Sequence, residues 1–131
     1  MPRYIIRLHD DQDGQDYLLE WSTIVDAPIT YGLSWEEFQE HYREEYGRRS
    51  FEMELPERMA RVDATGTSSR LHDSVDAVIS FNHAGPNETC LSKEQIIERY
   101  CRNREQTQVQ EEHEQWVEAG MPGLLPPGSM N

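Results

Sequence analysis

The sequence is short of positive charge. It has 131 residues, with 12 Lys and Arg against 25 Asp and Glu, so its formal net charge is -13 and its isoelectric point is about 4.7. Proteins that bind nucleic acids or anionic membranes directly need clustered basic side chains to replace phosphate counterions. We therefore expect neither direct nucleic-acid binding nor membrane association. A protein partner, basic or itself nucleic-acid-binding, suits this charge, although a high net charge also serves solubility alone.

Cysteines, long apolar runs and cofactor motifs are also scarce or missing. Cys90 and Cys101 are the only cysteines and show no CxxC or zinc-ligand spacing, so we expect reduced thiols. Neither a run of about 18 apolar residues nor a charged-then-apolar leader is present, which predicts a cytoplasmic protein. We expect no cofactor, because no dinucleotide, phosphate-loop or metal-ligand motif occurs.

What is present indicates one small folded domain. With 36% hydrophobic residues, 28% charged residues and a mean hydropathy of -0.84, the chain can form a modest core. We expect a single α+β domain over residues 1–120. Residues 121–131 are rich in Pro and Gly and predict an extended tail.

Two strands are predicted near the start of the chain. Alternation places these side chains on one face: Tyr4, Ile6 and Leu8, then Tyr17, Leu19, Trp21, Thr23 and Val25. The Asp-rich segment 9–16 predicts a hairpin connection, with Gly14 free to adopt positive φ. Residues 9–20 also have the acidic spacing of a calcium loop, but His9 stands at the first ligand position and the flanks are not helical in pattern. We expect a hairpin, with Glu20 in a strand and pointing away from the apolar face.

Two helix starts are predicted by capping boxes. Ser34 with Glu37, and Ser92 with Gln95, have the spacing in which side chains and backbone cap each other reciprocally. The first helix is expected over residues 35–46, ending at Gly47. Its expected apolar stripe is Trp35, Phe38, Tyr42 and Tyr46, with His41 and the glutamates on a solvated side. The second helix is expected over residues 93–118, its second half projecting from the body.

The segments between these helices are less clearly patterned. Ser50–Leu55 alternates and predicts a third strand, with Phe51, Met53 and Leu55 on one face. Residues 56–62 fit a short helix or an extended segment, and residues 75–81 permit a helix or a strand.

The acidic end of the second helix is the candidate partner-binding site. Residues 105–118 contain five glutamates and no Lys or Arg, and the tail adds two leucines that a partner could order. The candidate residues are Glu105, Glu111, Glu112, Glu114, Trp116, Glu118, Leu124 and Leu125.

Motifs for catalysis or ligand binding are weak. The run His72-Asp73-Ser74 contains triad residue types, but neighbours in sequence do not form a triad, and no G-x-S-x-G elbow occurs. Neither His41 nor His113 has a second histidine at metal-ligand spacing. A small enzyme or ligand-binding protein that uses loops 66–73 and 82–87 remains an alternative.

One stretch resembles a known group of proteins. Residues 21–32 (WSTIVDAPITYG), with the acidic segment that ends in EEYG at 44–47, resemble parts of small accessory proteins of actinobacterial phages. The resemblance covers the first third to half of the chain and implies no activity or site residues. It implies a setting, in which a phage product acts inside a host bacterial cell and binds a host protein.

These observations together predict a noncatalytic, acidic protein-binding module. A nucleic-acid mimic is the first alternative, because rows of glutamates can occupy the basic groove of a DNA-binding protein. The two rows are Glu36, Glu37, Glu40, Glu44 and Glu45, and the five glutamates of residues 105–118.

Overall fold

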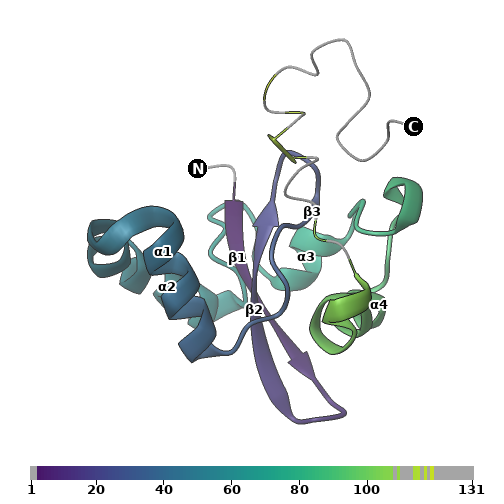
Figure 1. The fold of residues 1–131 in the computed structure, drawn as a ribbon, viewed down its shortest axis with the longest axis horizontal. Helices are drawn as coiled ribbons and strands as arrows, with labels where there is room; N and C mark the ends of the chain where they lie inside the picture. The colour runs from purple at the N-terminus through teal and green to yellow at the C-terminus, as the bar shows by residue number, and fades with distance from the viewer. Residues whose placement is uncertain (1–2, 108, 110–113, 116, 118, 120–131) are drawn as a thin grey trace.

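A computed structural model describes residues 3–107, 109, 114, 115, 117 and 119 of the chain. These residues form an antiparallel sheet packed with helices, which confirms the predicted α+β class. The strands are β1 (Arg3–Asp10), β2 (Gln15–Ser22) and β3 (Ala27–Pro28). The helices are α1 (Trp35–Met53), α2 (Leu55–Thr65), α3 (Val75–Ile79) and α4 (Lys93–Ile96), with a π-helix η2 (Ile97–Arg102) and 3-10 turns η1 (Pro86–Glu88) and η3 (Arg104–Gln106). Helices α1 and α2 lie on one side of the sheet, and α3 and α4 lie on the other (Figure 1).

The predicted hairpin is confirmed. In the β1–β2 register Tyr4 faces Trp21 and Ile6 faces Leu19, as the alternation required. Pairing continues to Asp10 opposite Gln15, which leaves residues 11–14 as the turn, with Gly14 at φ 73°. Strand β2 ends at Ser22 rather than at the predicted residue 25, because a turn over residues 23–26 reverses the chain to form β3.

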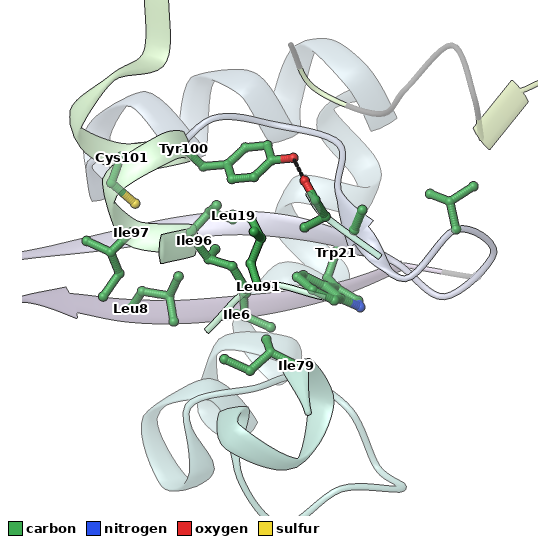
Figure 2. Close-up of a cluster of buried hydrophobic side chains, with 13 residues drawn as sticks. Ile6, Leu8, Leu19, Trp21, Ile79, Leu91, Ile96, Ile97, Tyr100 and Cys101 are labelled. Carbon is green, nitrogen blue, oxygen red and sulfur yellow. Dashed lines mark hydrogen bonds between the residues drawn. The ribbon is translucent and has the colours of Figure 1, made fainter. Parts of the chain in front are cut away.

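One face of the sheet carries a continuous apolar core. Residues of β1 and β2 pack there against the second half of the chain (Figure 2). We call this set the apolar-face core: Ile6, Leu8, Leu19, Trp21, Val25, Ala27, Ile79, Ala84, Leu91, Ile96, Ile97, Tyr100 and Cys101. The Tyr100 hydroxyl donates to the Ala84 carbonyl at 2.9 Å, so the buried phenol is satisfied.

The opposite face is covered by α1 and α2. Its smaller core consists of Ile5, Leu18, Phe38, Tyr42, Leu55 and Val62. Glu20 lies on this same face and is fully buried, which confirms that it points away from Leu19 and Trp21. The sheet is therefore covered on both sides, and the two cores belong to different parts of the chain.

Both predicted capping boxes are present. The Ser34 Oγ accepts from the Glu37 N–H at 3.1 Å, and the Ser92 Oγ accepts from the Gln95 N–H at 3.1 Å. In each box the third-position side chain accepts from the cap residue's N–H in return. Helices α1 and α4 therefore begin where the sequence predicts.

The first helix continues beyond its predicted end. Gly47 breaks the helical geometry with φ 89° and ψ 166°, but helical turns resume and run to Met53. The predicted strand at Ser50–Leu55 is therefore wrong. Met53 is 71% exposed, so the alternation of apolar residues has no buried face. Phe51 and Leu55 instead pack on the α1–α2 side with the four-residue spacing of a helix.

The two undecided segments are both helical. Helix α2 begins beside Pro56 and ends at Gly66, which has the left-handed φ of 89° that suits a helix terminus. Helix α3 begins after Ser74, whose side chain accepts from the Ala77 N–H. None of the helices in the described part of the chain is long and apolar enough to cross a membrane.

The predicted helix over residues 93–118 is wrong in length. It ends at Arg102, the last residue of η2. The apolar stripe formed by Ile96, Ile97, Tyr100 and Cys101 lies entirely within α4 and η2. Asn103 leaves the helical region at φ -108° and ψ 50°. The predicted projection of the second half is also wrong, because Val109 and Val117 pack against the apolar-face core and Glu114 is buried. The predicted tail at residues 121–131 lies outside the described residues.

Candidate functional site

The predicted partner-binding glutamates do not form one solvated face. Glu105 is exposed on η3, as expected. Glu114 is instead only 2% exposed, and Arg3 donates to it at 2.7 Å, so its carboxylate already has a partner within the chain. The other candidates lie outside the described residues: Glu111, Glu112, Trp116, Glu118, Leu124 and Leu125.

The triad-like run His72-Asp73-Ser74 is divided among structural roles. The His72 Nδ1 lies 2.7 Å from the Ser69 Oγ, and its ring meets the Tyr4 ring edge-on. The Ser74 hydroxyl caps α3. Asp73 is exposed. The run is thus a connection between α2 and α3 rather than a nucleophile held by a base.

The two loops of the alternative site, 66–73 and 82–87, have different surroundings in the fold. In the second loop the buried Asn82 side chain forms hydrogen bonds with the backbone of Ile79, Ala84 and Leu91. Its role is therefore to hold these segments together beside the apolar-face core. The first loop runs along the free edge of β1. Three residues of that first loop, Ser68, Arg70 and Leu71, line a pocket, and none of residues 82–87 does.

This pocket has a volume of about 380 Å³ and lies between β1, α1, α2 and the loop after α2. We call it the arginine pocket. Its lining is Arg3, Tyr4, Tyr42, Glu54, Glu57, Arg58, Arg61, Ser68, Arg70 and Leu71. Four guanidinium groups therefore gather at one site of a chain with a net charge of -13.

The spacing along α2 explains why two of the four arginines, Arg58 and Arg61, lie together. Glu54, Glu57, Arg58 and Arg61 are three or four residues apart and so share one face of the helix. The loop after α2 is fixed against the edge of β1. Ser68 is its anchor, because its N–H donates to the Ile5 carbonyl, its Oγ accepts from the Ile5 N–H, and its carbonyl accepts from Arg61. This clamp brings Arg70 and Leu71 to the mouth of the pocket.

Three of the four arginines are paired with carboxylates. Arg3 bonds Glu114 and lies 3.8 Å from the exposed carboxylate of Glu45. Glu57 accepts from both Arg61 and Arg70. Burial opposes the charge on Arg3, but the bonds to Glu114 and to the Tyr46 hydroxyl outweigh it and raise the pKa of Arg3. Arg3 therefore stays charged.

Arg58 is the exception. Its guanidinium donates to two neutral acceptors, the Tyr42 hydroxyl at 3.1 Å and the Arg3 carbonyl at 2.8 Å. Within the part of the chain that the structure describes, it makes no ion pair. A guanidinium has five N–H donors, and the two contacts leave most of them without a described protein acceptor. A positive charge with unused donors thus lines the pocket.

A polar network between the sheet and α1 fixes Arg3, which lines the pocket. The Tyr46 hydroxyl accepts from Arg3 at 2.7 Å and donates to Glu20 at 2.6 Å, and the His41 Nε2 lies 2.8 Å from the second Glu20 oxygen. The prediction of a solvated His41 is therefore wrong, because α1 turns this side chain toward the sheet. Burial and the adjacent Glu20 carboxylate raise the pKa of Tyr46 far above its usual value. Tyr46 remains a neutral donor that fixes Arg3 and Glu20 together.

The acidic residues of the hairpin have protein partners. Arg102 bonds both oxygens of the buried Asp10 and lowers its pKa to about 2. Asp13 accepts from the Tyr17 hydroxyl at 2.6 Å, and Asp16 lies 2.8 Å from the His9 Nδ1. Among the described residues, no group of three or more His, Cys, Asp or Glu side chains is arranged to hold a metal ion.

Both cysteines are free, as predicted. Cys90 is exposed and Cys101 is buried in the apolar-face core. Burial raises the pKa of the Cys101 thiol to about 12, so it is protonated near neutral pH.

Comparison of the chain with protein-family models, curated proteins and solved structures gave no match. The site therefore has to be interpreted from its own geometry. Sequence patterns missed the arginine pocket because its cations come from positions 3, 58, 61 and 70. The only available signal was the helical spacing of Arg58 and Arg61, and it required α2 to be recognised as a helix.

Proposed function

We propose that the protein is a noncatalytic protein-binding module that holds its partner at the arginine pocket. The observation that carries the proposal is a concave cationic pocket with an apolar side chain displayed at its mouth. Leu71 lines that mouth and is 83% exposed. Arg and Tyr are among the residue types enriched at the energetic centres of protein interfaces, and both line this pocket.

The chemistry of the lining supports binding over reaction. Guanidinium groups stay protonated near neutral pH, so the arginines cannot act as general bases. The Ser68 hydroxyl already accepts from the Ile5 N–H, and Glu57 is held by two arginines. These contacts favour a site that recognises charge and shape. The resemblance to phage accessory proteins supports a partner in the cytoplasm of a bacterial host.

A pull-down tests this proposal. The immobilised full chain is incubated with an actinobacterial lysate, beside a Leu71→Asp variant. We expect wild type to retain a saturable partner and Leu71→Asp to lose it. The matched control is Phe81→Asp, since Phe81 is 85% exposed and does not line the pocket. Absence of any saturable partner, or equal loss in both variants, would refute the proposal.

A chain truncated after Ala119 separates the pocket from the predicted tail contacts. Retention of the partner by the truncated chain supports the pocket. Loss of the partner on truncation, with retention by Leu71→Asp, would place binding at the tail that contains Leu124 and Leu125 instead.

Nucleic-acid mimicry is the second candidate, and one observation favours it. Helix α1 exposes a row of acidic side chains, namely Glu36, Glu37, Glu40, Glu44 and Glu45. A partner that reads this row as phosphates should be displaced by excess duplex DNA and released by added salt. Binding that survives both treatments would exclude mimicry.

A further inference from the structure

We infer that the arginine pocket takes a single carboxylate from the partner, bound to Arg58, with the partner's adjacent apolar group on Leu71. The inference deepens the proposed function and rests on it, in that the carboxylate belongs to a protein. It names the chemistry that this pocket recognises.

The first reason is the state of Arg58. It is held in place by the Tyr42 hydroxyl and the Arg3 carbonyl, while its guanidinium carbon lies 5.8 Å from the centre of the Tyr42 ring. Its planar fork is therefore oriented before a ligand arrives, which reduces the entropy lost on binding. Because both acceptors are neutral, an incoming anion displaces no carboxylate from Arg58.

The second reason is the number of charges. Arg3 pairs with Glu114, and Arg61 and Arg70 share Glu57, so among the described residues Arg58 is the arginine of this lining that has no carboxylate partner. Glu54 and Glu57 line the same pocket. A phosphate group carries between one and two negative charges near neutral pH and would meet stronger repulsion from these two carboxylates. A carboxylate carries one charge and matches the guanidinium fork with two oxygens.

The third reason is the apolar surface beside the charge. Leu71 is the most exposed apolar side chain of the lining, and Tyr4 adds the edge of an aromatic ring. A free inorganic anion would not use this surface. A C-terminal residue with an apolar side chain, or an acidic residue next to one, would use both the cation and Leu71.

The test uses small probes and the full chain. N-acetyl-leucine presents a carboxylate and an isobutyl group, N-acetyl-leucinamide is its neutral counterpart, and inorganic phosphate is the competing anion. Binding is followed at neutral pH by the ¹H–¹⁵N shifts of the Tyr4, Arg58, Ser68 and Leu71 amides. We expect saturable shifts with N-acetyl-leucine at millimolar concentration. We expect affinities at least about tenfold lower for the amide and for phosphate.

Variants assign the effect to Arg58. Arg58→Gln keeps hydrogen-bond donors for Tyr42 and the Arg3 carbonyl but removes the charge, and should weaken N-acetyl-leucine at least about tenfold. Arg99→Gln is the matched control, because Arg99 is exposed on η2 across the sheet, and it should leave binding unchanged. The dispersed amide spectrum of Arg58→Gln shows whether that variant is folded. If it is not, Arg58→Lys, which keeps the charge without the fork, should weaken binding instead.

Four outcomes would overturn the inference: no shift with N-acetyl-leucine, equal shifts with the amide, tighter binding of phosphate, or unchanged binding in folded Arg58→Gln. These outcomes are distinct from failure of the proposed function. If the probe binds but no partner is captured, the pocket chemistry stands and its ligand is a free carboxylic acid. If wild type and Arg58→Gln capture the same partner equally, the module binds protein without using the pocket carboxylate site.

Discussion

The two faces of the central sheet are built by different physical means. The face toward α3, α4 and η2 has the larger apolar core, and the polar groups around it, the Tyr100 hydroxyl, the Asn82 amide and the Asp10–Arg102 pair, are each hydrogen-bonded to neighbouring groups. The face toward α1 and α2 has a smaller apolar core and a hydrogen-bonded chain in which the neutral Tyr46 hydroxyl joins the charged Arg3 and Glu20. The proposed binding pocket opens on this second face.

The two faces therefore contribute differently to stability and to the positioning of side chains. Close packing of apolar groups gives rigidity and stability without chemical selectivity. Buried polar groups contribute less net stability, but each has to meet a specific partner, so they fix side-chain positions. On this protein the apolar face stabilises the sheet, and the polar face orients the arginines that line the pocket. Substitutions on one face at a time should separate these two contributions.

The largest expected effect is truncation in the apolar-face core. Leu19→Ala should lower the free energy of unfolding by about 2–5 kcal/mol, because Leu19 is fully buried and the cavity cannot reach solvent. Its neighbour Leu18 faces α1 and lines a second surface pocket beside Trp35 and Met59, so Leu18→Ala should cost less. Urea unfolding of both variants measures the difference. An equal or larger loss for Leu18→Ala would contradict the comparison.

The next largest effect on stability is expected in the hydrogen-bonded network of Arg3, Tyr46 and Glu20 on the other face. Arg3→Met should cost about 1–3 kcal/mol, because it leaves the buried Glu114 carboxylate and the Tyr46 hydroxyl without their donor. Adding Glu114→Gln should recover part of the loss, since the unpaired charge is then absent. A double-mutant cycle by chemical denaturation measures this coupling. Strict additivity of the two changes would mean that the pair is not energetically linked.

A smaller effect should appear in acid at the ion pair that joins β1 to η2. Arg102 lowers the pKa of Asp10 from 3.8 to about 2 in the folded protein. A lowered carboxyl pKa stabilises the fold above about pH 4, and this contribution is lost as pH falls toward 2. The melting-temperature difference between wild type and Asp10→Asn should therefore shrink over that range. A constant difference from pH 5 to pH 2 would show that the pair does not act through its charge.

The smallest effect is expected at the exposed hairpin end. A hydrogen bond with Asp16 raises the pKa of His9 above 6.5, so any stabilisation is present below that pH and disappears as pH rises through the folded value. Because the pair is exposed, its effect on stability should be slight. An NMR titration of the His9 ring gives the pKa directly. Asp16→Asn should lower it, and an unchanged midpoint would argue against the contact.

The hairpin and both capping boxes were predictable because each is a local pattern. Alternation predicted which side chains of the two strands share the apolar face, Ile6 and Leu19 among them, and Ser34 and Ser92 marked the starts of their helices. The buried position of Glu20 was not predictable from its own strand, since alternation says only which face it shares. Ile5 and Leu18 on that face were the available signs that it is covered as well.

The errors arose where local patterns compete. Phe51, Met53 and Leu55 alternate as in a strand, but Phe51 and Leu55 also have helical spacing. In the fold these two residues pack with the smaller core, which favours the helical conformation. The helix after Lys93 was predicted to be too long, because the glutamate-rich segment 105–118 contains no residue that typically ends a helix. The candidate site was missed because Arg3, Arg58 and Arg70 meet only through tertiary structure.

The two ends of β1 have a consequence for how the chain reaches this structure. Arg3 pairs with Glu114, 111 residues later, and Asp10 pairs with Arg102, 92 residues later. Such long loops close slowly, because their entropy is lost before the contact forms. On the ribosome the β1–β2 hairpin can form early, but neither of these ion pairs can form until its distant partner has been synthesised. The pairing of β1 is therefore completed only after residues 102 and 114 have been made, although the Arg3 that lines the pocket can bond Tyr46 before then.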